Sequence, residues 1–142
     1  MNLNSENPKV GRDFQEFVQK CLEQAFGRSF LQEYPFYIRM PARPHRFDCV
    51  SVDQTIVVEC KCYTWTVSGN IPSAKMATLD EVLFYMSFLP AEVTKIIAIN
   101  KANTTEKSET FAEYFFRTKK HLLRDVQIYE IDSDGGIVIY KN

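Results

Sequence analysis

Apolar residues recur every three or four positions near the start of the chain, which predicts an amphipathic helix over roughly residues 9–26. This face contains Val10, Phe14, Phe17, Val18, Cys21, Leu22 and Ala25. Gly27 follows, and glycine commonly ends a helix. The aromatic-rich residues 29–40 predict a strand with irregular ends, before Pro41 and Pro44 interrupt regular structure.

Two further strands are predicted over residues 46–52 and 55–63. Asp53 and Gln54 lie between them, which predicts a two-residue hairpin turn, although the favoured glycine is missing. The hairpin sets which residues of the two strands face each other, so its register decides the candidate chemistry.

The second half of the chain alternates between helices and strands. A helix is expected from about Pro72, because proline suits the first turn of a helix. Residues 93–100 are almost continuously apolar, which is typical of a strand buried on both faces. A helix over roughly 107–124 and short strands over 126–131 and 137–140 follow. This order predicts an α/β domain with a mixed sheet covered by helices.

The length of 142 residues predicts a single domain over residues 1–142. Seventeen basic and eighteen acidic residues give a formal charge of −1, which excludes a strongly basic nucleic-acid binder but leaves a local basic surface open. No apolar stretch is long enough to span a membrane, and the N-terminus lacks the apolar segment of a signal peptide. We therefore expect a cytoplasmic protein whose four cysteines are free thiols.

The hairpin register brings acidic residues together. If Val52 pairs with Thr55, Asp48 lies directly opposite Glu59. Opposed residues have Cβ atoms about 4.5–5.5 Å apart on one face of a sheet. Lys61, two residues beyond Glu59, leaves the same face. Two carboxylates and an ammonium group are thus expected in one patch.

Two carboxylates this close repel each other, and a divalent cation between them would compensate. Oxygen ligands select a hard ion, so we expect Mg²⁺, with Mn²⁺ able to substitute. Such an ion activates bound water, and Lys61 could orient or deprotonate that water. The alternative is a cross-strand ion pair on an exposed hairpin.

The pattern Asp48 … Glu59-Cys60-Lys61 resembles the signature of the PD-(D/E)xK nucleases. The segment over residues 11–22 is similar to the first helix of Mrr-type restriction endonucleases. The resemblance implies a restriction-endonuclease-like three-layer fold with an αβββαβ core. It also implies a Mg²⁺-dependent endonuclease that hydrolyses phosphodiester bonds in nucleic acid, with DNA favoured. Asp48 and Glu59 would hold the metal, the Cys60 carbonyl would be a further ligand, and Lys61 would be the catalytic lysine.

Two positions depart from the family pattern. Phe47 stands where the signature has proline, and Gln15 occupies the acidic position of the first helix. On a helical wheel Gln15 can look along the sheet toward the site, whereas Glu16 points to solvent. We therefore expect Gln15 to support the site, and its neutral amide favours one-metal chemistry.

Basic residues near these elements are candidates for contacts with nucleic-acid phosphates. One group precedes Asp48 and contains Arg39, Arg43, His45 and Arg46. Another lies on the third expected helix and contains Arg117, Lys119, Lys120, His121 and Arg124. Lys75, near the start of the second helix, is a further candidate, since helix N-termini attract phosphate. The alternative for each is solubilising surface charge.

Rival interpretations remain open. Cys49, Cys60 and Cys62 share the opposite face and could bind zinc, although their spacing lacks the usual knuckle. The chain could also be a nuclease-like module that binds nucleic acid or a protein partner without cutting. Its small size favours a homodimer for enclosing a duplex.

Overall fold

The computed structural model describes residues 8–37, 44–63, 73–102 and 108–142. The helices within them are α1 (Pro8–Phe26), α2 (Ser73–Met86) and α3 (Phe111–Leu123). The strands are β1 (Phe30–Tyr37), β2 (Pro44–Ser51), β3 (Ile56–Lys61), β4 (Thr94–Asn100), β5 (Val126–Ile131) and β6 (Ile137–Tyr140). The order of elements agrees with the prediction, and β5 and β6 have the predicted bounds.

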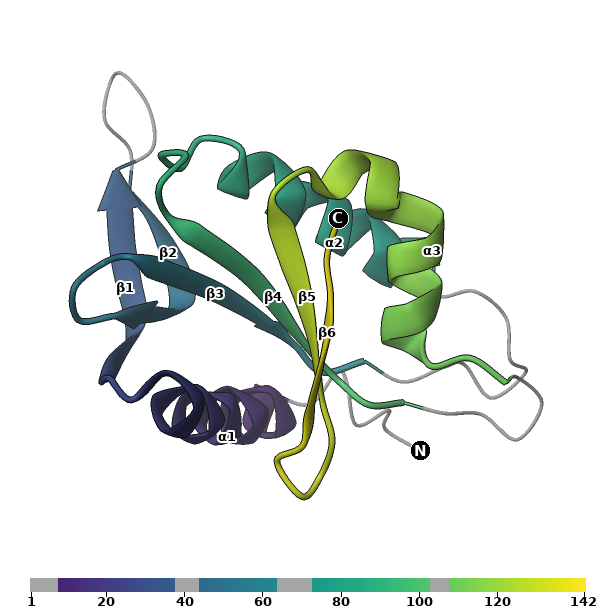
Figure 1. Ribbon diagram of the computed structural model, residues 1–142, viewed down its shortest axis with the longest axis horizontal. Helices are drawn as coiled ribbons and strands as arrows, with labels where there is room; N and C mark the ends of the chain where they lie inside the picture. Colours follow the sequence, from purple (N-terminus) through teal and green to yellow (C-terminus); the bar gives the residue numbers. More distant parts are fainter. Residues whose placement is uncertain (1–7, 38–43, 64–72, 103–107) are drawn as a thin grey trace.

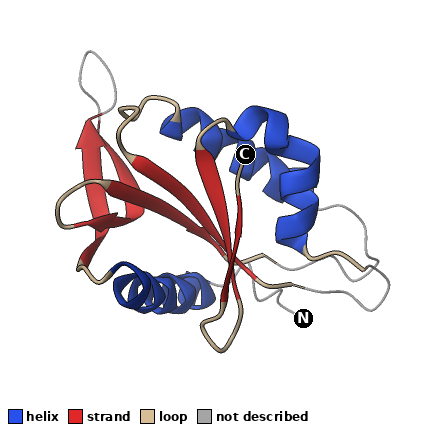
Figure 2. Ribbon diagram, viewed as in Figure 1, coloured by secondary structure: helices blue, strands red, loops and turns tan. Residues whose placement is uncertain are grey.

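The six strands form one mixed sheet in the order β1-β2-β3-β4-β5-β6. β3, β4 and β5 are parallel, and the remaining neighbours are antiparallel. α1 lies against one face, while α2 and α3 lie on the other side (Figure 1). The protein is therefore an α/β domain with its helices in layers on either side of the sheet (Figure 2).

Two apolar clusters fill the spaces between these layers. The α1-side cluster includes Val18 and Leu22 of the helix, packed with Val58 and Ala98 of the sheet. The α2-side cluster includes Leu79, Met86 and Phe115 of the helices, packed with Val57, Ile97 and Ile128. Five consecutive residues of β4 are buried, which confirms the prediction that this strand is covered on both faces.

Local signals explain where two helices end or begin. Gly27 follows α1 with a φ of 65°, a left-handed conformation that suits glycine at a helix C-terminus. Thr110 caps α3, because its side chain accepts from the Glu113 amide while the Glu113 side chain accepts from the Thr110 amide. This capping box starts α3 at Phe111, so the helix is shorter than the predicted 107–124.

The β2–β3 hairpin has the predicted register, with Cys49 opposite Val58 and Val50 opposite Val57. The predicted two-residue turn is wrong, because β2 ends at Ser51 and β3 begins only at Ile56. The longer connection preserves the register of the strands.

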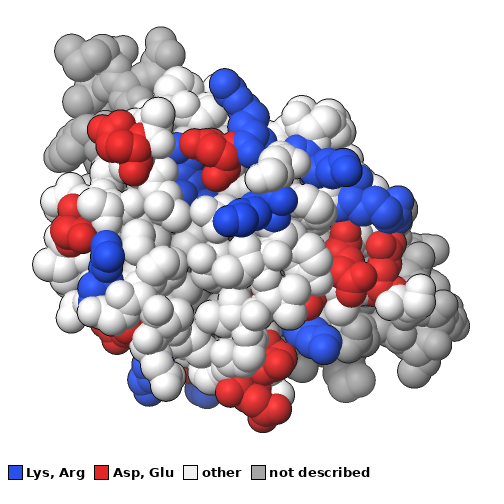
Figure 3. Space-filling view, in the orientation of Figure 1, with Lys and Arg blue, Asp and Glu red and all other residues white. Residues whose placement is uncertain are grey.

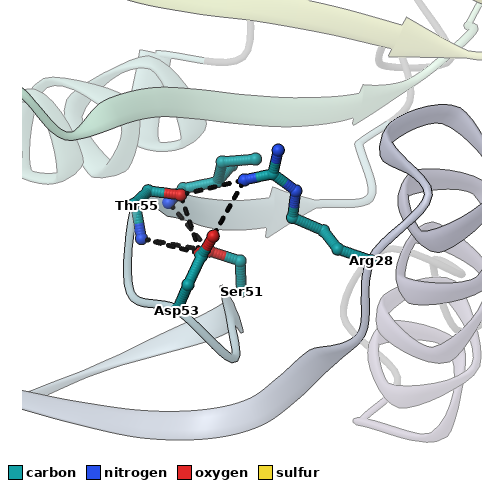
Figure 4. A network of polar contacts seen from close by, with 5 residues as sticks. Arg28, Ser51, Asp53 and Thr55 are labelled. Atoms are coloured by element: carbon teal, nitrogen blue, oxygen red, sulfur yellow. Dashed lines mark hydrogen bonds and ion pairs between the residues drawn. The ribbon is translucent and has the colours of Figure 1, made fainter.

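Side chains rather than a glycine stabilise this connection (Figure 4). The buried Ser51 hydroxyl accepts from the amides of Thr55 at 3.1 Å and Ile56 at 3.0 Å. The Asp53 carboxylate accepts from the Thr55 hydroxyl and pairs with Arg28 at 3.0 Å. Gln54 takes the left-handed position, with a φ of 61°. The amides of Thr55 and Ile56 thus find their partner in a side chain, which stabilises this longer connection.

Among the described residues, no helix combines the length and the apolar character needed to cross a bilayer.

Candidate active site

Asp48 and Glu59 lie directly beyond the last paired residues of β2 and β3. They are the next pair outward in the register of Cys49 with Val58. The Asp48 amide donates to Glu59 Oε1 at 3.2 Å, and the Cys60 amide donates to Asp48 Oδ2 at 2.7 Å. The two carboxylates therefore accept bonds from the backbone of the opposite strand, and the predicted acidic pair is brought together.

β2 changes its side-chain alternation at Asp48. Phe47 is buried in the α2-side cluster, whereas Cys49 is buried in the α1-side cluster. β1 shows the same change, because Phe30 belongs to the α1-side cluster while Tyr34 packs against the α2-side cluster. Asp48 thus lies where the side-chain alternation of the two strands is broken, so that Phe47 and Cys49 point to opposite faces of the sheet.

Glu33 is the residue of β1 that accompanies this change. It lies between the pairs Gln32–Cys49 and Tyr34–Phe47, and so stands across from Asp48. Its φ of 55° is left-handed, which is uncommon outside glycine and breaks the alternation of a strand. Sequence reasoning missed Glu33, since no local pattern marks a left-handed residue inside a strand.

Gln15 of α1 reaches the same place, as predicted. Its side chain is largely buried, and Nε2 lies 3.2 Å from the Asp48 carbonyl oxygen and 3.3 Å from Glu33 Oε1. The same amide nitrogen approaches Gln32 Oε1 at 3.4 Å. Glu16, the neighbouring acid, is exposed as expected. Gln15 therefore links the helix to the strands that carry Glu33 and Asp48.

The electrostatics favour a compensating positive charge. Burial, followed by repulsion from Asp48, raises the pKa of Glu59 to about 8, against the opposing effect of Lys61. Burial also raises the pKa of Asp48, although the Cys60 amide and Lys61 act in the other direction. The charge of Glu33 raises the pKa of both carboxyl groups. In the described part of the chain, none of the three acids forms an ion pair with Lys or Arg.

The donor set fits a hard cation only in part. Asp48 and Glu59 supply adjacent carboxylate oxygens, and the half-buried Lys61 is close enough to affect both. Within the described residues, however, no three His, Cys, Asp or Glu side chains form a ready-made metal cage. Water and backbone oxygen would have to complete the coordination, as is common for Mg²⁺. The zinc interpretation of Cys49, Cys60 and Cys62 gains no support from the same finding.

The structure describes only part of the basic group that precedes Asp48. Arg39 and Arg43 lie outside the described residues. His45 stacks on Tyr85 with ring centroids 3.9 Å apart, and burial lowers the pKa of its imidazole. This lowered pKa argues against a charged phosphate contact by His45 at neutral pH. Arg46 is exposed.

The helical basic residues differ in their contacts. Lys75 Nζ lies 5.4 Å from the centroid of the buried Tyr63 ring, and Lys119 pairs with Asp80 at 3.2 Å. Lys120 is exposed. Figure 3 shows Lys and Arg gathered over α3, with acidic side chains directly beneath them. The surface in this view is mixed in sign rather than broadly basic.

No protein-family model matches the chain, and no curated protein matches it. Among solved structures, the chain is similar to part of a complex of Thermococcus gammatolerans McrB AAA+ hexamers with bound McrC, with 15% sequence identity and a TM-score of 0.45. The match covers 90% of this chain and 30% of that chain. A likeness at this level carries no argument about function.

Proposed function

We propose that this protein is a metal-dependent nuclease of the PD-(D/E)xK kind, which hydrolyses phosphodiester bonds in nucleic acid, with DNA favoured. The observation that carries the proposal is the contact between Asp48 and Glu59, with Lys61 two residues further along β3. The element order and the mixed sheet support a restriction-endonuclease-like fold.

A divalent cation suits the chemistry of the acidic pair. Glu59 is only 6% exposed, and a buried carboxylate beside a second one needs a compensating charge. Carboxylate oxygens favour Mg²⁺, with Mn²⁺ able to substitute. We assign Asp48, Glu59 and the Cys60 carbonyl to this ion. When bound, Mg²⁺ lowers the pKa of a water ligand and neutralises charge on a phosphoryl oxygen.

The other residues of the proposed site orient the attacking water, hold Asp48 in place or contact the substrate phosphates. The Lys61 ammonium group would stabilise the negative charge that develops on the phosphoryl oxygens and would orient the attacking water. Gln15 holds the Asp48 backbone through its carbonyl oxygen, so that the carboxylate keeps its place beside Glu59. Arg46, Lys75 and Lys120 are the candidates for phosphate contacts.

Cleavage assays test this proposal directly. The wild-type protein is incubated with single- and double-stranded DNA and RNA, with Mg²⁺, with Mn²⁺, or with EDTA. Asp48→Asn and Lys61→Ala are compared with Asp134→Asn and Lys141→Ala, which alter exposed residues outside the predicted motif. We expect metal-dependent cleavage that is lost in the first two variants and retained in the controls.

A non-catalytic module is the second candidate, favoured by the lack of a three-residue metal cage among the described side chains. Salt-sensitive nucleic-acid binding that is unchanged in Asp48→Asn and Lys61→Ala, without cleavage of any substrate, would establish it and refute the nuclease.

A further inference from the structure

Glu33 contacts the proposed site without belonging to the predicted motif. It stands across β1 from Asp48, as Glu59 does across β3. The three acids therefore form one row over three neighbouring strands. Glu33 is exposed, whereas Glu59 is buried.

A shared hydrogen-bond donor connects Glu33 to the acidic pair. The Gln15 amide nitrogen lies 3.3 Å from Glu33 Oε1 and 3.2 Å from the Asp48 carbonyl oxygen. In the described ranges, Glu33 has no Lys or Arg ion-pair partner that would offset its negative charge.

We propose that Glu33 is a positioning residue that strengthens divalent-cation binding at Asp48 and Glu59, by its negative charge and by its hydrogen bond to Gln15. It acts at longer range than a ligand, since the described acids form no three-residue cage. This inference rests on the proposed function. A unit charge several ångströms from a dication near the protein surface changes the affinity by about three- to tenfold.

Cation binding without substrate provides the test. Mn²⁺ affinity is measured by calorimetry for the wild type, Glu33→Gln and Glu33→Asp, at low and high ionic strength. Glu16→Gln is the control, because Glu16 is an exposed acid next to Gln15. We expect Glu33→Gln to weaken Mn²⁺ binding by about three- to tenfold at low salt and by less at high salt. Glu33→Asp should retain most of the affinity, and Glu16→Gln should resemble the wild type.

The outcomes separate this inference from the proposed function. If the wild type binds Mn²⁺, Asp48→Asn abolishes binding and Glu33→Gln does not change it, the role of Glu33 is refuted while the metal site stands. If the wild type does not bind Mn²⁺, both proposals fail. Glu33→Asn, which tolerates a left-handed backbone, replaces Glu33→Gln if that variant does not fold. Loss of affinity with unchanged circular dichroism supports the proposal.

Discussion

The backbone amide of Asp48 donates to the Glu59 side chain over 3.2 Å, and this hydrogen bond holds the two acids of the site together. It offsets only part of the cost of burying Glu59. Burial and the neighbouring Asp48 carboxylate still raise the pKa of Glu59 to about 8.

The first prediction concerns pH and stability. In the folded protein Glu59 has a pKa of about 8, against an ordinary value of 4.5, so it keeps its proton where the unfolded chain loses it. The free energy of unfolding should therefore fall as the pH rises from about 4.5 to 8 in EDTA, by about 1.4 kcal/mol for each pKa unit at most. Urea denaturation across this range measures the fall.

Glu59→Gln should remove most of this pH dependence, whereas Glu92→Gln, at an exposed position, should retain it. Mg²⁺ at pH 8 should raise the melting temperature of the wild type but not of Glu59→Gln. A wild-type stability that does not change between pH 4.5 and 8 would contradict the raised pKa.

The second prediction separates chemistry from metal binding. Lys61→Ala should lower kcat by about 10²- to 10³-fold, because the ammonium group acts on the developing charge. Mn²⁺ affinity should be retained or slightly increased, since a positive charge near the ion is removed. Calorimetry and single-turnover cleavage measure the two effects separately. An equal loss of Mn²⁺ affinity and of cleavage would indicate a structural role for Lys61 instead of a catalytic one.

The third prediction concerns Gln15. Gln15→Leu removes the donor to the Asp48 carbonyl oxygen and should lower the free energy of unfolding by about 1–3 kcal/mol. Cleavage should also fall, because Asp48 loses its support. Gln24→Leu, at an exposed position of the same helix, is the matched control and should change stability by less than about 0.5 kcal/mol. Urea denaturation compares the two variants.

The fourth prediction concerns the hairpin connection. The Ser51 hydroxyl is buried and accepts from two amides, so Ser51→Ala should cost about 1–3 kcal/mol of stability. Ser133→Ala, in the exposed β5–β6 turn, should be close to neutral. If both variants melt at the wild-type temperature, the connection does not depend on the hydroxyl.

The fifth prediction concerns the substrate surface. Arg46→Ala and Lys120→Ala should each weaken nucleic-acid binding and reduce the slope of log K against log salt by about 1. Lys119→Ala should have a smaller effect, because its ammonium group already pairs with Asp80. Fluorescence anisotropy at several salt concentrations measures the slopes. Identical slopes for all three variants and the wild type would exclude these three residues from binding.

The sequence determined the order of elements and the pairing of Asp48 with Glu59. Apolar periodicity distinguishes helices from strands, and a single hairpin register decides which residues of β2 and β3 oppose each other. The connection is longer than predicted, but the register of β2 and β3 is the predicted one. The roles of Lys61 and the metal remain predictions.

Only the tertiary structure decided what surrounds this pair. Glu33 stands across from Asp48 because of the β1–β2 register, and no local pattern encodes its left-handed backbone. The Lys119–Asp80 pair depends on how α3 packs beside α2, so the sequence could not separate Lys119 from Lys120. Such contacts join residues distant in the chain, and they follow from the packing of whole elements rather than from the residues at either end.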